Sequence, residues 1–302
     1  SGMMGTIGVL CARIRVEEKQ IAAALAEAGS SMQPIHPAAL PMPPAPPVPL
    51  PPAPALAGGL AGEIVIDRLK SRAVASGFTR ALRLAGTVVL GAGLAATSDR
   101  LAVATALASA GVPRPACWFA PDDETALAAI ESGGYPSTLL PLAYDSPSVV
   151  LLDRDTAEAI TEHRMVLGHG VERVSLVQLG SSIGGSLVIV VDGRAIAARV
   201  SDATTLSSRT LRIAEQAAAA IGADIAGVEI VDGPNGPLVW DIDPAPDFRH
   251  AAPLDGQSAA EAIAALAMSR AGAARPSGQA TSPLASFAFD REEVRGDIIL
   301  TA

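Results

Sequence analysis

The sequence predicts an α/β fold in its first part and an α+β fold in the rest. Over residues 3–92, strand-like apolar runs alternate with helical stretches, which is typical of a parallel sheet covered by helices. From about residue 171 the pattern changes to consecutive strands joined by tight turns, which indicates an antiparallel sheet. We therefore expect an N-terminal parallel α/β domain followed by two α+β subdomains.

The N-terminal domain, residues 3–92, opens with the apolar run TIGVLCA, which predicts a short buried strand. The stretch VEEKQIAAALAEAG then predicts a helix that ends at Gly29. Residues 34–54 contain 11 prolines in 21 positions, so they can form neither a helix nor a central strand, and we expect an extended connection. Further elements of this domain are a strand at 62–69, a helix at 72–85 and a strand at 86–91.

The central subdomain, residues 93–170, mixes helical and strand-like stretches. SDRLAVATALASAG predicts a helix over residues 98–111, with Ser98 as its N-cap and Gly111 as its stop. The strand-like runs CWFA and PSTLLPLA enclose DDETALAAIESG, which predicts a helix with an acidic first turn, as helix N-termini favour.

The C-terminal subdomain, residues 171–271, contains the runs ERVSLVQLG, GGSLVIVVDG and RAIAARVS, which we interpret as adjacent antiparallel strands. The last two meet at Asp192-Gly193, a strong hairpin signal. A helix over SRTLRIAEQAAAAIGAD precedes a second hairpin, formed by AGVEIVDG and GPLVWDID, and a last helix covers about 257–271. Residues 272–302 are expected to be a linker and a tail.

Composition and charge narrow the functional class. The 302-residue chain has a net charge of −9, which argues against a nucleic-acid partner because phosphates need a basic surface. No apolar run is long enough to span a bilayer and no signal peptide is visible, so we expect a cytoplasmic protein without membrane contact. Lys19 and Lys70 are the only lysines, so a mechanism that needs a lysine has two candidates. Cys11 and Cys117 lie in apolar runs, and we interpret both as reduced core residues.

The hairpin that ends in LVWDIDPAPDF carries closely spaced carboxylates. If it turns within GPNG, Glu229 lies opposite Asp241, and cross-strand partners point to the same face. Asp243 falls on that face, while strand alternation predicts Trp240 and Ile242 on the other. Converging carboxylates repel one another, and a hard cation such as Mg²⁺ relieves the repulsion. A solvated outer face with alternating acids is the other interpretation of the same pattern.

The order of these elements resembles the ATP-grasp superfamily of carboxylate–amine ligases. GVLCARIRVEEKQIAAAL, TSDRLAVATALASAGVPRP and GVEIVDGPNGPLVWDIDPAPDF are similar to the branch that holds the lysine-biosynthesis, ribosomal-protein glutamate and tetrahydromethanopterin glutamate ligases. The resemblance covers nearly the whole chain except the C-terminal tail. It implies that ATP and Mg²⁺ are held between two α+β subdomains, that a substrate carboxylate is phosphorylated, and that an amine displaces the phosphate.

The resemblance also implies roles for particular residues. Arg100 stands where the family has a phosphate-binding lysine, and arginine keeps the charge. Gln178 and Leu179 correspond to the hinge that reads adenine. The implied Mg²⁺ ligands are Glu229, Asp241 and Asp243, of which the last replaces an asparagine of the family.

Two departures from the family weaken the expected phosphate site. Leu140, in TLLPL, replaces a second lysine, and leucine cannot contact a phosphate. AYDSPSVVLLDRD replaces a glycine-rich loop and contains no glycine, so its backbone N–H groups cannot easily cradle a phosphate. We therefore expect weak or undetectable ATP binding by the chain alone, and we expect Leu140 to be a core residue.

Arginines are the candidates for binding anionic substrates. Arg13 and Arg15 follow the first strand, where open α/β sheets bind ligands, and Arg249 follows the acidic strand. Pairing of the first two with Glu17 or Glu18 is the alternative.

Two functions stay open on the sequence alone. One is an ATP-dependent ligase that joins an amino acid, such as glutamate, to a small acid or a pterin-type C1 cofactor. The other is a catalytically inactive relative that keeps the fold for ligand binding or assembly. The expected partners are small acids and amines, with a second copy of the chain or a pathway protein as a further candidate.

Overall fold

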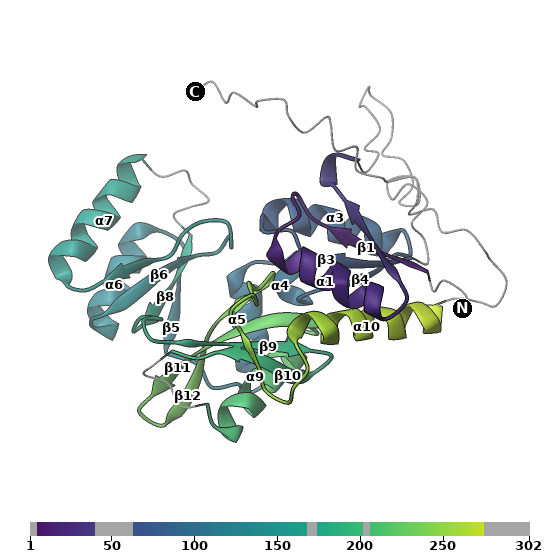
Figure 1. The fold of residues 1–302 in the computed structure, drawn as a ribbon. Helices are drawn as coiled ribbons and strands as arrows, with labels where there is room; N and C mark the ends of the chain where they lie inside the picture. Colours follow the sequence, from purple (N-terminus) through teal and green to yellow (C-terminus); the bar gives the residue numbers. More distant parts are fainter. Residues whose placement is uncertain (1–4, 40–62, 168–173, 202–205, 275–302) are drawn as a thin grey trace, which may run out of the picture.

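The computed structural model describes residues 5–39, 63–167, 174–201 and 206–274, and the structural statements below refer to these residues. They form three sheets. In Figure 1 the N-terminal sheet and the central sheet lie on opposite sides of the molecule, and the C-terminal sheet lies below them. This mixture of one parallel and two antiparallel sheets confirms the predicted fold class.

The N-terminal sheet is parallel throughout. Its strands, in spatial order, are β2 (Ser31–Ile35), β1 (Thr6–Leu10), β3 (Ile64–Asp67) and β4 (Val88–Leu90). Helix α1 (Val16–Glu27) and helix α3 (Arg72–Leu84) follow β1 and β3 in the chain. Ile7 and Val9 of β1 share a core with α1, whereas Leu10 shares a core with α3. A parallel sheet covered in this way needs inner strands that are mostly apolar, and the inner strands β1 and β3 read TIGVL and IVID.

The proline-rich segment begins inside this sheet. Pro34 lies in β2, and β2 is an edge strand, where proline is tolerated because its missing N–H faces away from the ladder. A short 3₁₀ turn, η1 (Pro37–Ala39), follows. The extended connection predicted for the remainder of 34–54 lies outside the described residues.

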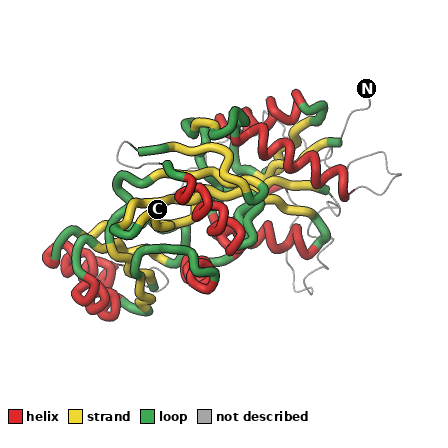
Figure 2. The backbone as a smooth tube through the Cα atoms, turned by 90° about the horizontal axis from the view of Figure 1, so that it is seen from below, coloured by secondary structure: helices red, strands yellow, loops and turns green. Residues whose placement is uncertain are grey.

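The central sheet is antiparallel throughout. Its strands, in spatial order, are β5 (Cys117–Ala120), β8 (Ser175–Leu179), β6 (Ser137–Pro141) and β7 (Val149–Leu151). Helices α6 (Asp123–Gly133) and α7 (Arg154–Leu167) complete this part. Figure 2 shows from below that they stand at one end of the molecule, with the strands between them and the N-terminal helices.

The position of β8 corrects the expected start of the C-terminal subdomain at residue 171. We predicted this strand beside 186–191, but β8 pairs with β5 and β6 instead. The linker between β8 and β9 contains Gly180 and Gly184, both with positive φ, which favours glycine. Along this linker the chain passes from the central sheet to the C-terminal sheet. The central part therefore includes β8.

The C-terminal sheet has both faces covered. Its strands, in spatial order, are β12 (Gly236–Asp243), β11 (Ile225–Gly233), β9 (Ser186–Val191), β10 (Arg194–Arg199) and β13 (Ala252–Pro253). Val188 and Val190 face a core shared with helix α9 (Ser208–Ala220). Leu187 and Ile189 face the opposite core, which contains helix α10 (Ala259–Ala274) and the N-terminal sheet. Asp192 and Gly193 both have positive φ, which confirms the predicted hairpin turn.

The segment after β4 corrects the expected boundary at residue 93. Helix α4 (Leu94–Thr97) and helix α5 (Arg100–Ser109) place Ala95, Ala96 and Val103 in the core under the C-terminal sheet. The N-cap of α5 is Asp99, whose carboxylate accepts from the N–H of Ala102, and not Ser98 as predicted. In the described part of the chain, none of the helices is both long and apolar enough to cross a bilayer.

Candidate functional site

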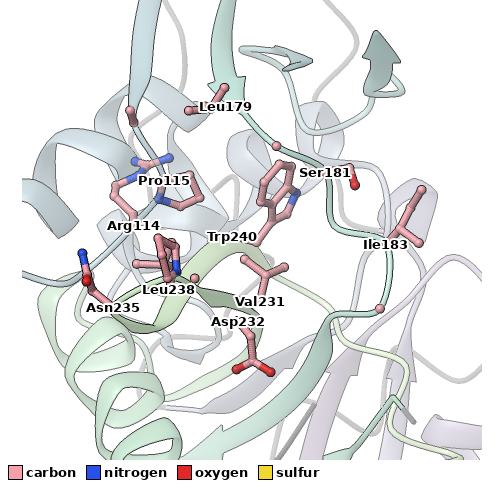
Figure 3. A pocket seen from close by; sticks show the side chains of 15 residues that line it. Arg114, Pro115, Leu179, Ser181, Ile183, Val231, Asp232, Asn235, Leu238 and Trp240 are labelled. Carbon is pink, nitrogen blue, oxygen red and sulfur yellow. The ribbon is translucent and has the colours of Figure 1, made fainter. Parts of the chain in front are cut away.

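Three cavities follow one another along the β11–β12 hairpin. The outer cavity, of about 640 Å³, is lined by residues that include Arg114, Pro115, Leu179, Ser181, Val231 and Trp240 (Figure 3). The middle cavity, of about 210 Å³, is lined by Ser182, Gly185, Ser186, Leu187, Arg199, Glu229 and Val231. The acid cavity, of about 230 Å³, is lined by residues that include Lys70, Arg72, Arg100, Tyr144, Glu229, Asp241 and Asp243. The outer and middle cavities share Val231 as a wall residue, and the middle and acid cavities share Glu229, so the three cavities lie in a row.

The hairpin pairs Glu229 with Asp241, as predicted, but a bulge is needed to do so. Ile230 pairs with Val239, so Trp240 is an extra residue opposite Glu229. Val239 and Ile242 consequently share the core under α9, which residues three apart in a regular strand could not do.

The bulge corrects the predicted faces of the strand. Trp240 does not share a face with Ile242; it lines the outer cavity. In Figure 3 its indole stands between Pro115 and Ser181, beside Val231. The extra residue therefore places an aromatic ring in the outer cavity and, at the next position, the carboxylate of Asp241 in the acid cavity.

Burial makes the acid cavity unfavourable for negative charge. Burial, with the charges of Asp241 and Asp243, raises the pKa of Glu229 to about 7, and the nearby positive charge of Arg199 opposes this. Burial also raises the pKa of Asp241, against the charge of Arg100. Oδ1 of Asp243 accepts a hydrogen bond from the N–H of Ala245 at 3.0 Å.

The predicted set of three metal-binding carboxylates is not assembled. Among the described residues, no group of three or more His, Cys, Asp or Glu side chains is arranged to hold a metal ion. The reason is that Asp241 turns to Arg100 and Asp243 to the backbone of its own loop. Mg²⁺ commonly takes one or two carboxylates and completes its shell with phosphates. Glu229 and Asp241, as cross-strand partners, fit such a cation only together with phosphate oxygens.

Arg100 is held by several groups at once. Its Nε donates to Oδ2 of Asp241 at 3.0 Å, and its Nη1 donates to the carbonyls of Pro141 and Ala143 at 2.8 and 2.9 Å. The guanidinium also lies 4.4 Å from the ring centre of Tyr144. In this structure the predicted phosphate-binding arginine is therefore the partner of a predicted metal ligand.

The predicted hinge residues differ in exposure. Gln178 is fully buried, with its side chain donating to the Trp240 carbonyl and accepting from Arg114 at 2.7 Å. Only Leu179 lines the outer cavity. Arg114, which the sequence analysis missed, lines it too, and its Nε and Nη1 are buried without a hydrogen-bond partner.

The arginines predicted to bind substrate do not line these three cavities. Arg15 forms an ion pair with Glu18 at 2.6 Å, the alternative considered above, and Arg13 is exposed. Arg249 pairs with Asp247 and lies 3.6 Å from Glu17. Arg15 and Arg249 therefore already have carboxylate partners in this structure.

The cations that line the inner cavities come from other places. Lys70 and Arg72 follow β3 at the carboxyl end of the N-terminal sheet, and Arg199 ends β10. The carboxyl end of a parallel strand is a usual ligand position, so this signal was present in the sequence. Leu140, by contrast, is 3% exposed and packs with Ala104 and Leu176, which confirms it as a core residue.

Comparisons with solved structures support this description. A RimK-domain ATP-grasp protein from Sphaerobacter thermophilus is 25% identical, with a TM-score of 0.65, and the match covers 94% of this chain and 99% of that one. The ATP-grasp ligase PsnB, complexed with minimal precursor, Mg and ADP, is 16% identical, with a TM-score of 0.61 and coverages of 88% and 98%.

A third structure, D-alanyl-alanine synthetase A from Vibrio cholerae, is 12% identical, with a TM-score of 0.57 and coverages of 90% and 100%. No protein-family model matches the chain. All three matches cover most of this chain and nearly the whole of the other chain. By its fold, this chain is a member of the ATP-grasp superfamily.

Proposed function

We propose that this chain is an ATP-dependent ligase that joins the amine of one substrate to the carboxylate of another. The row of three neighbouring cavities along the β11–β12 hairpin carries the proposal. Trp240, Leu179 and Leu238 give the outer cavity apolar walls, to which Arg114 and Asp232 add two charged side chains. Charged side chains also line the middle cavity and the acid cavity. A nucleoside triphosphate, with a flat base at one end and phosphates at the other, has the matching shape and polarity.

Each cavity has a role in this proposal. The base lies in the outer cavity beside Trp240, and the phosphates pass Arg199 in the middle cavity. The terminal phosphate reaches the acid cavity, where the substrate carboxylate meets it. A divalent cation held there by Glu229 and Asp241 would offset the negative charge of the phosphates. The PsnB structure, which contains Mg and ADP, supports this choice of ligands.

The proposed reaction has two steps. A carboxylate oxygen of the acid attacks the γ-phosphorus of ATP, and ADP leaves, which gives an acyl phosphate. The amine nitrogen then attacks the acyl carbon, loses a proton, and phosphate leaves as the amide bond forms. Walls that exclude water favour both steps, because water would hydrolyse the acyl phosphate.

The substrates that we propose follow from the sequence resemblance. Glutamate is the candidate amine, and a small acid or a pterin-type C1 cofactor is the candidate carboxylate.

An inactive relative that binds ligands is the second candidate function. Leu140 provides no cation, and a charge-assisted contact of this kind is worth about 1.5–3 kcal/mol. The absence of this charge-assisted contact lowers ATP affinity by roughly one to two orders of magnitude. The ion pair between Arg100 and Asp241 further occupies a residue that the cation would need.

Calorimetric titration with ATP and Mg²⁺, followed by mass spectrometry of mixtures of acid, amine and ATP, tests the proposal. If the chain is a ligase, it binds ATP weakly and forms ADP and phosphate over many turnovers only when acid and amine are both present, because acid alone supports ADP formation only up to the acyl phosphate. Asp241→Asn should weaken ATP binding in Mg²⁺ and leave it unchanged in EDTA. Binding without ADP formation would favour the inactive relative, and equal weakening in EDTA would show that Asp241 has a structural role only.

A further inference from the structure

Lys70 reaches the acid cavity from a different domain. It follows β3 of the N-terminal sheet, and its ammonium donates to the carbonyl of Ala245 in the loop after β12. The residues are 175 positions apart in the chain. The side chain stays open to solvent and lines the cavity together with Glu229, Asp241 and Asp243.

The other cations of this cavity already have carboxylate partners. Arg100 pairs with Asp241 at 3.0 Å, and Arg72 pairs with Asp67 at 3.2 Å. Within the described ranges, Lys70 has no ion pair with a carboxylate, and the bond to Ala245 uses one of its three ammonium protons. Among the described residues that line this cavity, Lys70 is thus the cation without a carboxylate partner, and it keeps donors for a ligand.

The backbone around Lys70 is fixed from two directions. Asp145, in the loop after β6, accepts hydrogen bonds from the N–H groups of Arg72 and Ala73 at 2.6 and 2.9 Å, and from the Ser71 hydroxyl at 2.9 Å. Arg68 donates to the carbonyl of Pro246 at 3.0 Å. All three parts of the chain therefore meet at residues 68–73, so the position of the ammonium does not depend on a free loop.

We propose that Lys70 binds the anionic oxygens of the ligand in the acid cavity and supplies positive charge that Leu140 cannot. The inference rests on the proposed function for the identity of the ligand, which is either the phosphate end of ATP or the carboxylate of the acid. Burial lowers the pKa of Lys70 and the charge of Asp243 opposes that change, and an approaching anion favours the ammonium form further.

The scarcity of lysine gives a direct test. Lys19 is exposed on α1, so it is an internal control for Lys70. The full chain is labelled briefly with acetic anhydride, and mass spectrometry measures the acetylation of each lysine. MgATP, pyrophosphate and glutarate are the probes, which separate a phosphate ligand from a carboxylate ligand. At about ten times its Kd, a ligand that covers Lys70 should slow its labelling about tenfold, and Lys19 should not change.

Variants provide the second measurement. Lys70→Gln should weaken the protecting ligand about tenfold, as expected for one charge-assisted hydrogen bond, and Lys70→Arg should retain part of the affinity. Lys19→Gln should have no effect. Circular dichroism and the unfolding midpoint of each variant establish that it is folded.

The outcomes separate this inference from the proposed function. ATP binding with unchanged Lys70 labelling overturns the inference and leaves the ligase proposal standing. Protection of Lys70 by glutarate or pyrophosphate without ATP binding supports the inference and contradicts the ligase proposal. Protection by none of the probes, or equal effects of the Lys70 and Lys19 variants, overturns the inference.

Discussion

The ion pair between Arg100 and Asp241 allows a quantitative test of the acid cavity. The pair spans 3.0 Å, and its side chains are 11% and 19% exposed. Breaking a fully buried pair by removing one partner costs about 3–5 kcal/mol, and the partial exposure here reduces our expectation to about 2–3 kcal/mol. We therefore expect Arg100→Met to lower the free energy of unfolding by that amount. Methionine keeps an apolar stem near Tyr144 but leaves Asp241 without its cation.

The double variant separates the ion pair from the other contacts of Arg100. Asp241→Asn removes the buried charge, so adding it to Arg100→Met should cost less than the sum of the two single changes. Urea unfolding followed by tryptophan fluorescence is the assay, because Trp240 is buried next to Asp241. Costs that add within about 0.5 kcal/mol would show that the two side chains do not interact, and the charge pairing described here would be refuted.

Three further predictions concern the core, the pH dependence and the thiols. Leu140→Ala should cost about 2–5 kcal/mol in urea unfolding, as for a core leucine, and Leu140→Lys should destabilise without improving ATP affinity; tighter ATP binding by the lysine variant would refute the core assignment. Burial opposes ionisation of Glu18, but its hydrogen bond from Arg15 and nearby positive charge outweigh this and lower the pKa. Ionised Glu18 therefore stabilises the fold at pH values above its ordinary pKa of 4.5. The difference in free energy of unfolding between the unchanged chain and Glu18→Gln should shrink as the pH falls from 4.5 through the lower folded-state pKa, and a difference independent of pH would contradict this. Burial raises the pKa of the Cys11 thiol to about 11, so a thiol reagent at neutral pH should label the partly exposed Cys117 first; equal rates would disprove the burial of Cys11.

The sequence predicted the features that depend on neighbours in the chain. The hairpin at Asp192-Gly193 and the pairing of Glu229 with Asp241 follow from turn chemistry and from the alternation of side chains. Even so, the pairing needs a bulge at Trp240. The turn is centred between Pro234 and Asn235, whereas a regular hairpin that pairs Glu229 with Asp241 would be centred on Asn235. The strand alternation alone could not show that the aromatic ring faces the outer cavity.

The features that the sequence did not predict depend on contacts between distant segments. Strand β8 was expected beside its sequence neighbour, but the choice between two antiparallel sheets is made by packing, and both would accept the alternation of SLVQL. The hydrogen bond from Arg114 to the side chain of Gln178 also joins residues 64 positions apart. Each local pattern was compatible with several partners, and only the assembled cores select one.

The acid cavity takes its positive charge from separate parts of the chain. A phosphate or carboxylate responds to where positive charge lies in space, and it does not distinguish the segment that carries the charge. Leu140, on the central sheet, packs against Ala104 as a core residue and offers no cation to a ligand. Lys70, which follows a strand of the N-terminal sheet, brings a cation to the β11–β12 hairpin; Asp145 holds the backbone N–H groups of Arg72 and Ala73 just after it, and the carbonyl of Ala245 holds its ammonium. Because these anchors belong to the other two parts of the chain, any movement that separates the parts also removes the ammonium from the cavity. Ligand binding at Lys70 should therefore be coupled to the docking of all three sheets.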